Sequence, residues 1–237
     1  MRKLLWLFAF GLALAIFPVP TNAQTGNLLP IPPVLQRFTA WCWLATGEMI
    51  FRYYGVPAND LSNYQCGEAR FQGAFLTGIP NQPFAGPCWM NCALCANIGS
   101  GPVQGIVNML TQYPAAMRIV TRNPISPVLQ PPQTAAAVPS ATIKSEIDAG
   151  HPLIAGISPS SLPMPPGLAE HAVLIVGYSQ SGNIIILNDP FPYQAAGMTP
   201  PYLQAGGAAL ALGRFEISYA AMVSALNWNT TVFGIGL

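Results

Sequence analysis

The chain contains few side chains that can do chemistry: five cysteines, two histidines and eight acidic residues among 237. One cysteine, Cys42, lies between Trp41 and Trp43 at the start of an expected helix. Unpaired backbone N–H groups and the helix dipole favour a negative charge at such a position. A thiol there ionises more readily, and the thiolate is the nucleophilic form. Cys42 is therefore the candidate nucleophile, with a buried structural cysteine as the plainer alternative.

The other four cysteines are clustered within a stretch rich in glycine and proline. They are Cys66, Cys88, Cys92 and Cys95. Four cysteines can form two disulfides in three different pairings, and the sequence leaves all three open. The spacing from Cys88 to Cys95 is also roughly that of zinc ligands. Disulfides are the favoured interpretation if the protein is exported to an oxidising compartment.

A cysteine nucleophile needs a base, usually a histidine that a third polar group orients. His171 opens the apolar run 171–178, whereas His151 follows a glycine and has no polar partner in prospect. Residues 179–182 predict a β-hairpin, and antiparallel pairing then returns residues 188–189 to the neighbourhood of His171. Asn188 and Asp189 are the two candidates to orient the histidine. The alternative is that Asn188-Asp189-Pro190 simply forms a turn.

Acyl transfer also requires hydrogen-bond donors for the oxyanion of the tetrahedral intermediate. The backbone N–H of Cys42, at the helix start, is one candidate donor. Gln36 lies six residues before Cys42, and its side-chain amide is the second candidate. A lone glutamine is weak evidence, so its value depends on this spacing.

The elements that position these residues follow from apolar patterning and from glycine and proline. A helix is expected over 40–54, with Thr39 as its cap and Gly55 at its end. Further helices are expected over 60–70, 102–112, 140–149 and 217–226. Strands are expected over 118–122, 152–157, 171–178, 184–188 and 228–235. Irregular segments are expected over 71–101, 124–139 and 158–167. Helices come mostly first and strands mostly later, which predicts an α+β fold.

Residues 1–23 have the pattern of a secretory signal peptide. Arg2 and Lys3 precede an uncharged apolar run over 4–17, and a small-residue cleavage site ends at Ala23. The run is shorter than the ~18–20 residues of a spanning helix, so an uncleaved anchor is the less favoured alternative. We therefore expect a secreted or periplasmic protein, cleaved after Ala23, with one domain over 24–237 and no stable membrane anchor.

The composition excludes several functions. Charged residues make up only 7% of the chain, against about 25% in an ordinary soluble domain. There is no basic excess to neutralise phosphates, which argues against nucleic-acid binding. The apolar fraction of 51% is too high for a disordered chain. No pattern calls for a cofactor or a catalytic metal, and the oligomeric state is left open.

These residues together resemble the papain-like cysteine peptidases. Gln36 followed by Trp41-Cys42-Trp43 is similar to the glutamine and the Cys-Trp helix start of that superfamily. The run His171-Ala-Val-Leu-Ile-Val-Gly-Tyr178 is similar to its histidine strand. Trp-Cys-Trp, the Gln65-Cys66 pair, the later cysteine cluster and Asp189-Pro190 resemble its bacterial branch, some members of which are secreted effectors.

The resemblance implies a papain-like fold, with a helical subdomain carrying Cys42 and an antiparallel-sheet subdomain carrying His171. It implies Cys42 as nucleophile, His171 as general base and acid, and Gln36 in the oxyanion hole. It favours Asp189 over Asn188, although plant and lysosomal relatives use asparagine. The expected activity is peptide-bond hydrolysis on a protein or peptide substrate through a thioester acyl-enzyme. The same residues could catalyse deamidation or transpeptidation instead. A catalytically silent binding protein that keeps the fold is a further alternative.

Overall fold

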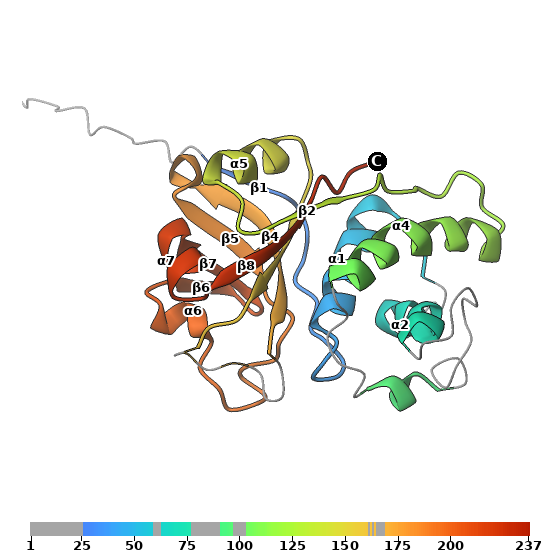
Figure 1. Ribbon diagram of the computed structural model, residues 1–237, viewed down its shortest axis with the longest axis horizontal. Helices are drawn as coiled ribbons and strands as arrows, with labels where there is room; N and C mark the ends of the chain where they lie inside the picture. The colour runs from blue at the N-terminus through green and yellow to red at the C-terminus, as the bar shows by residue number, and fades with distance from the viewer. Residues whose placement is uncertain are drawn as a thin grey trace, which may run out of the picture.

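In the computed structural model, the described residues are 26–58, 63–76, 91–96, 103–160, 162, 164 and 169–237. Within them, the three longest helices lie on one side of the molecule, and the β-sheet and the later α-helices lie on the other (Figure 1). The helical side holds α1 (Cys42–Tyr54), α2 (Tyr64–Leu76) and α4 (Val103–Val120). The predicted signal peptide and Cys88 lie outside the described residues. The α+β prediction is confirmed.

The sheet is antiparallel throughout and follows the order β2-β8-β3-β4-β5-β7-β6, with short β1 paired to β4. Its strands are β1 (Asn27–Leu28), β2 (Gln133–Ala135), β3 (Leu153–Ile157), β4 (His171–Ser179), β5 (Ile184–Asn188), β6 (Ala208–Ala211), β7 (Arg214–Ser218) and β8 (Trp228–Phe233). The central strands β3, β4 and β5 are nearly continuous apolar runs, as expected where a sheet is covered on both faces. Helices α1 and α5 (Ser140–Asp148) both pack against β4.

The predicted hairpin is confirmed. Strands β4 and β5 pair antiparallel around the short turn η2 (Gln180–Gly182), with Leu174 opposite Asn188. This register places the end of β5 close to the start of β4. Helix α1 begins at Cys42, two residues after the predicted start at 40, and ends at Tyr54 as predicted. Gly55 follows it with a φ of 73°, the left-handed conformation that glycine adopts easily.

The strand predicted over 118–122 is wrong. Helix α4 continues from Val103 to Val120 and contains Pro114, although the helix was predicted to end at 112. The helix continues because Tyr113 and Met117 are fully buried, and their packing outweighs the backbone hydrogen bond that proline cannot make. The apolar pair at 119–120 that suggested a strand is largely exposed at the helix end.

Other boundaries also differ from prediction. Helix α2 extends to Leu76, so 71–76 is not irregular, and residues 133–135 of the expected loop form β2. The helix predicted over 217–226 is shorter than expected. Its first two residues belong to β7, and α7 covers Tyr219–Ser224, with the side chain of Ser218 as its cap. The sequence did not predict β1, β6 or α6 (Pro201–Gln204). The cap predicted for α1 at Thr39 is wrong, because the cap position is Trp41 and no side chain bonds there.

The described cysteines are either disulfide-bonded or free, and the free one is Cys42. Cys66 of α2 forms a disulfide with Cys92 at the start of the short helix η1 (Cys92–Cys95), with 5.5 Å between their Cα atoms. Cys95 is also disulfide-bonded, and Cys42 is free and buried. Two residues of the four-cysteine set are therefore joined to each other, which removes them as thiolate ligands of a zinc ion.

Helices α1 and α2 approach each other closely at Gly47. A Cβ at this glycine would lie 2.8 Å from a carboxylate oxygen of Glu68 and 2.6 Å from Met109. The Glu68 side chain is fully buried, and neither of its oxygens has a hydrogen-bond partner. Burial, reinforced by nearby Glu48, raises the pKa of Glu68 well above 4.5. The folded protein therefore holds this carboxyl in its neutral form over a range where the unfolded chain ionises it.

We expect Glu68→Gln to stabilise the protein increasingly as the pH rises above 4.5. The raised pKa gives the wild type full stability below 4.5 and a growing loss above it, whereas glutamine does not ionise. Urea unfolding of both proteins at pH 4 and pH 8 measures the difference. A stability gap that is the same at both pH values would contradict this account.

Candidate active site

Cys42 is the first residue of α1 and is fully buried. The turn before it is fixed from outside the helix, because the Trp41 indole N–H donates to the carbonyl oxygen of Cys95 at 3.1 Å. Phe38 packs edge-on against the same indole. The disulfide-bonded segment therefore holds the start of α1 in place, and α1 presents the free thiol at its N-terminus.

His171 is the first residue of β4 and is also fully buried. Its Nε2 lies 2.7 Å from Oδ1 of Asp189, and Phe191 packs edge-on against the ring. Nδ1, the other ring nitrogen, is buried without a hydrogen-bond partner. The Cys42 thiol is close enough to affect the pKa of the ring, and Nδ1 is the nitrogen left to face it. The two groups are adjacent, and such contacts often tighten only when substrate binds.

The pKa of His171 reflects this environment. Burial alone would lower the pKa of the imidazole, because it disfavours the charged ring. The charge and hydrogen bond of Asp189, with a smaller effect from Cys42, outweigh burial and raise the pKa from 6.5 to about 10. The histidine is therefore protonated at neutral pH, as a group that protonates a leaving amine must be.

With only two histidines, this pKa can be measured directly. In protein carrying labelled histidine, we expect the His171 ring to titrate near pH 10 by NMR. Asp189→Asn removes the negative charge and should lower that pKa toward 6.5, since burial is then opposed only by the smaller effect of Cys42. The free energy of unfolding should depend on pH in the matching way. The contribution of His171 to stability is complete below pH 6.5 and is lost as the pH rises through about 10. A ring that titrates at the same pH in both proteins would rule out Asp189 as the cause.

Asp189 accepts four hydrogen bonds and is fully buried. Oδ1 accepts from His171 and from the backbone N–H of Phe191 at 2.7 Å. Oδ2 accepts from the hydroxyls of Tyr193 at 3.0 Å and Tyr202 at 2.7 Å. Burial and the nearby carboxylate raise the pKa of both tyrosines, which keeps them as neutral donors. These four donors fix the carboxylate in one orientation beneath the histidine.

Sequence reasoning missed both tyrosines. Tyr193 follows Asp189 by four residues, so a local signal was available. Tyr202 comes from α6, an element that was not predicted, and only the tertiary structure brings it to the aspartate.

We expect Tyr202→Phe to destabilise the protein by about 1.5–3 kcal/mol, the cost of a hydrogen bond to a buried charged group. Tyr219→Phe is the matched control, because its hydroxyl makes a neutral bond to the carbonyl of Val138 at 3.1 Å on a partly exposed ring. Urea denaturation measures both. Equal effects of the two substitutions would show that Tyr202 has no special link to the carboxylate.

The structure shows which of the two candidates, Asn188 or Asp189, contacts His171. Neighbouring residues of a strand point to opposite faces. Asn188 donates to the carbonyl oxygen of Ile31 at 2.9 Å and accepts from Arg214 at 2.9 Å, away from the histidine. Asp189 is therefore the residue in contact with His171. The expectation that His151 has no polar partner is wrong, because the ring lies 3.2 Å from Glu146, but it is not part of this cluster.

Gln36 lies in the loop before α1, but its amide is already engaged. Nε2 donates to the carbonyl oxygens of Phe38 at 3.0 Å and Thr39 at 2.6 Å, and Oε1 is buried without a partner. These bonds shape the loop that leads to Cys42. Gln36 would have to release one of them to donate to an oxyanion, so its role in the oxyanion hole remains a prediction.

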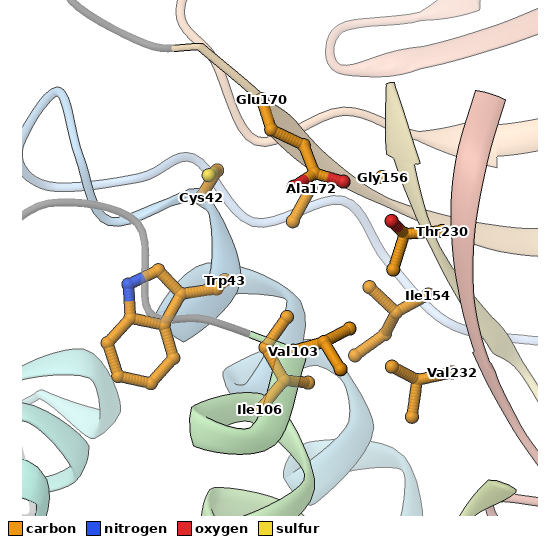
Figure 2. Close-up of a pocket in the computed structure, with 10 residues that line it drawn as sticks. All are labelled: Cys42, Trp43, Val103, Ile106, Ile154, Gly156, Glu170, Ala172, Thr230 and Val232. Atoms are coloured by element: carbon orange, nitrogen blue, oxygen red, sulfur yellow. The ribbon is translucent and has the colours of Figure 1, made fainter. Parts of the chain in front are cut away.

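A small cavity of about 30 Å³ lies directly beside the nucleophile candidate (Figure 2). Cys42 and Trp43 form one side, and the residues around them come from α4, β3, β4 and β8. The apolar part of its lining consists of Val103, Ile106, Ile154, Ala172 and Val232. Among the described residues, no group of three or more histidine, cysteine or acidic side chains could hold a metal ion, and no helix is long and apolar enough to cross a membrane.

A free cysteine at a helix start, next to a histidine that is bound to an aspartate, is an arrangement that thiol-dependent hydrolases and transferases use. The chain matches the Peptidase_C39-like family over residues 19–225, and it belongs to that family. A solved structure described as a candidate C39-like peptidase from Bacillus anthracis is similar, with 11% identity and a TM-score of 0.43. The match covers 87% of this chain and 96% of that one. A comparison with curated proteins gives no match.

Family membership supports the broader part of the resemblance seen in the sequence, a cysteine peptidase superfamily. It also supports protein or peptide substrates in general terms. The assignment to the bacterial secreted branch, and the individual roles of Cys42, His171, Asp189 and Gln36, remain predictions.

Proposed function

We propose that this protein is an exported cysteine endopeptidase that hydrolyses peptide bonds with Cys42, His171 and Asp189. The observation that carries the proposal is the position of His171. One ring nitrogen is bound to Asp189 at 2.7 Å, and the other is unpartnered next to the free Cys42 thiol. This arrangement supplies a nucleophile, a proton carrier and an orienting group in the order that acyl transfer requires.

The reaction would follow from these three groups. The Cys42 thiolate attacks the peptide carbonyl carbon, and a C–S bond forms as the carbonyl oxygen becomes an oxyanion. His171 gives its Nδ1 proton to the leaving nitrogen, the C–N bond breaks, and a thioester remains. Water then attacks the thioester, His171 accepts a proton from it, and the acid and Cys42 are released. The backbone N–H of Cys42 and the amide of Gln36 are the proposed donors to the oxyanion.

Export is the second part of the proposal. The disulfide between Cys66 and Cys92 is consistent with an oxidising compartment. Membership of the bacterial secreted branch of papain-like peptidases would agree with this location. Expression from the full gene followed by N-terminal sequencing tests it: the exported protein should begin at Gln24. A product that retains Met1 and stays with the membrane would contradict cleavage of residues 1–23.

The activity is tested by incubating the purified protein with a broad peptide library and following masses. Hydrolysis should give new peptide termini, with water added across one bond. A gain of about one mass unit with no chain break would indicate deamidation through the same acyl-enzyme. Joined peptides would indicate transpeptidation. An unchanged library would contradict the proposed enzyme and favour a silent binding protein.

A further inference from the structure

The cavity beside Cys42 contains one acidic side chain, Glu170, which directly precedes His171 in the chain. Its carboxylate lies at the same end of the cavity as Cys42, and the apolar side chains of Ile106, Ile154 and Val232 lie at the other end (Figure 2). The oxygen Oε1 of Glu170 is buried and has no hydrogen-bond partner.

The backbone of β3 makes room for this carboxylate. A Cβ at Gly156 would lie 2.2 Å from Oε1 of Glu170 and 3.0 Å from the side chain of Thr230. Any other residue at 156 would therefore displace the acid from the cavity. The hydroxyl of Thr230 does not pair with it, because that hydroxyl donates to the side chain of Asn229 at 2.9 Å.

Nor does a cation of the chain neutralise Glu170 among the described residues. Arg52 pairs with Glu48, and Lys144 pairs with Asp148. Arg214 is bound to Asn188, while His171 faces Asp189. A carboxylate oxygen that is buried without a donor costs free energy, which a ligand carrying a positive charge and N–H groups would recover.

We propose that Glu170 selects substrates that place an ammonium group in this cavity. The inference rests on the proposed function, because the cavity is formed in part by the nucleophile. The ammonium could come from a lysine side chain or from the free α-amine of a short substrate. Both present a compact charge with several donors, which suits a cavity of about 30 Å³ better than a planar guanidinium does. The apolar walls would accept the methylene groups attached to that nitrogen.

Cys42-directed vinyl sulfones test this without requiring turnover. One pair of acetylated dipeptide probes carries lysine or uncharged norleucine in the first position, and a second pair carries them in the second position. A fifth probe has norleucine first and a free α-amine. The rate of addition to Cys42 is followed by intact mass. We expect a charged probe to react at least about tenfold faster than its uncharged partner, as for a hydrogen bond to a charged group.

The variants identify the residue responsible. Glu170→Gln should bring the charged and uncharged rates together, whereas Glu216→Gln, the same change on β7, should keep the preference. Faster reaction of the lysine probes would identify a side chain as the source of the ammonium, and faster reaction of the free-amine probe would identify a terminus. Equal rates for all probes in the wild type, or a preference that survives in Glu170→Gln, would overturn the inference.

A failure of the proposed function would give a different result from a failure of the role of Glu170. If iodoacetamide labels Cys42 but no probe is preferred, only the role of Glu170 is lost. If neither iodoacetamide nor any probe labels Cys42, the proposed nucleophile is wrong and the inference falls with it.

Discussion

Cys42→Ala is expected to lower kcat/KM for peptide hydrolysis by at least about 10⁴-fold, because loss of a nucleophile removes the acyl-enzyme route altogether. The fold should survive. The thiol is fully buried but makes no disulfide, so alanine removes one sulfur atom from the start of α1 and disturbs no covalent link.

Initial rates on a peptide cleaved by the wild type measure this loss, and near-UV circular dichroism verifies that the variant is folded. The comparison also excludes a contaminating protease, which would cleave equally in both preparations. Substantial cleavage by a folded Cys42→Ala protein would show that another group is the nucleophile.

His171→Ala is expected to lower kcat/KM by about 10³-fold or more, because one ring both deprotonates the thiol and protonates the leaving amine. His151→Ala is the natural control, since it removes the only other histidine. His151 lies 3.2 Å from Glu146 and packs against Gly236, away from Cys42.

The His151 variant should therefore stay close to the wild-type rate, with at most a loss of stability from its contact with Glu146. The reverse pattern, with His151 essential and His171 dispensable, would contradict the assignment of the base. Similar losses in both variants would point to a general effect on folding, which urea unfolding of each protein would reveal.

The sequence predicted the core of this site because the deciding features were local. The hairpin between His171 and Asp189 is short and bounded by apolar strands, so the pairing of its ends could be predicted from spacing alone. The end of the helix that carries Cys42 followed from the glycine and proline after Tyr54, whereas its start was predicted two residues early, at 40. The odd cysteine count agrees with Cys42 as the one free cysteine among the described residues.

The features that sequence reasoning missed depend on contacts between distant segments. Tyr202 reaches Asp189 from a four-residue helix that has no periodicity of its own. The apolar residues at the end of α4 fit a strand equally well on local grounds, and only the burial of Tyr113 and Met117 favours the longer helix. The amide of Gln36 has the predicted spacing, but its hydrogen bonds could not be foreseen.

The most direct test of the central claim is the reactivity of cysteines in the purified, non-reduced protein at near-neutral pH. Iodoacetamide should add one group, peptide mapping should place it on Cys42, and the reaction should slow markedly in His171→Ala. This result is expected even though Cys42 is fully buried, because the adjacent His171 can take the proton of the thiol as it reacts. No adduct on Cys42, an adduct on another cysteine, or a rate that does not depend on His171 would contradict the account.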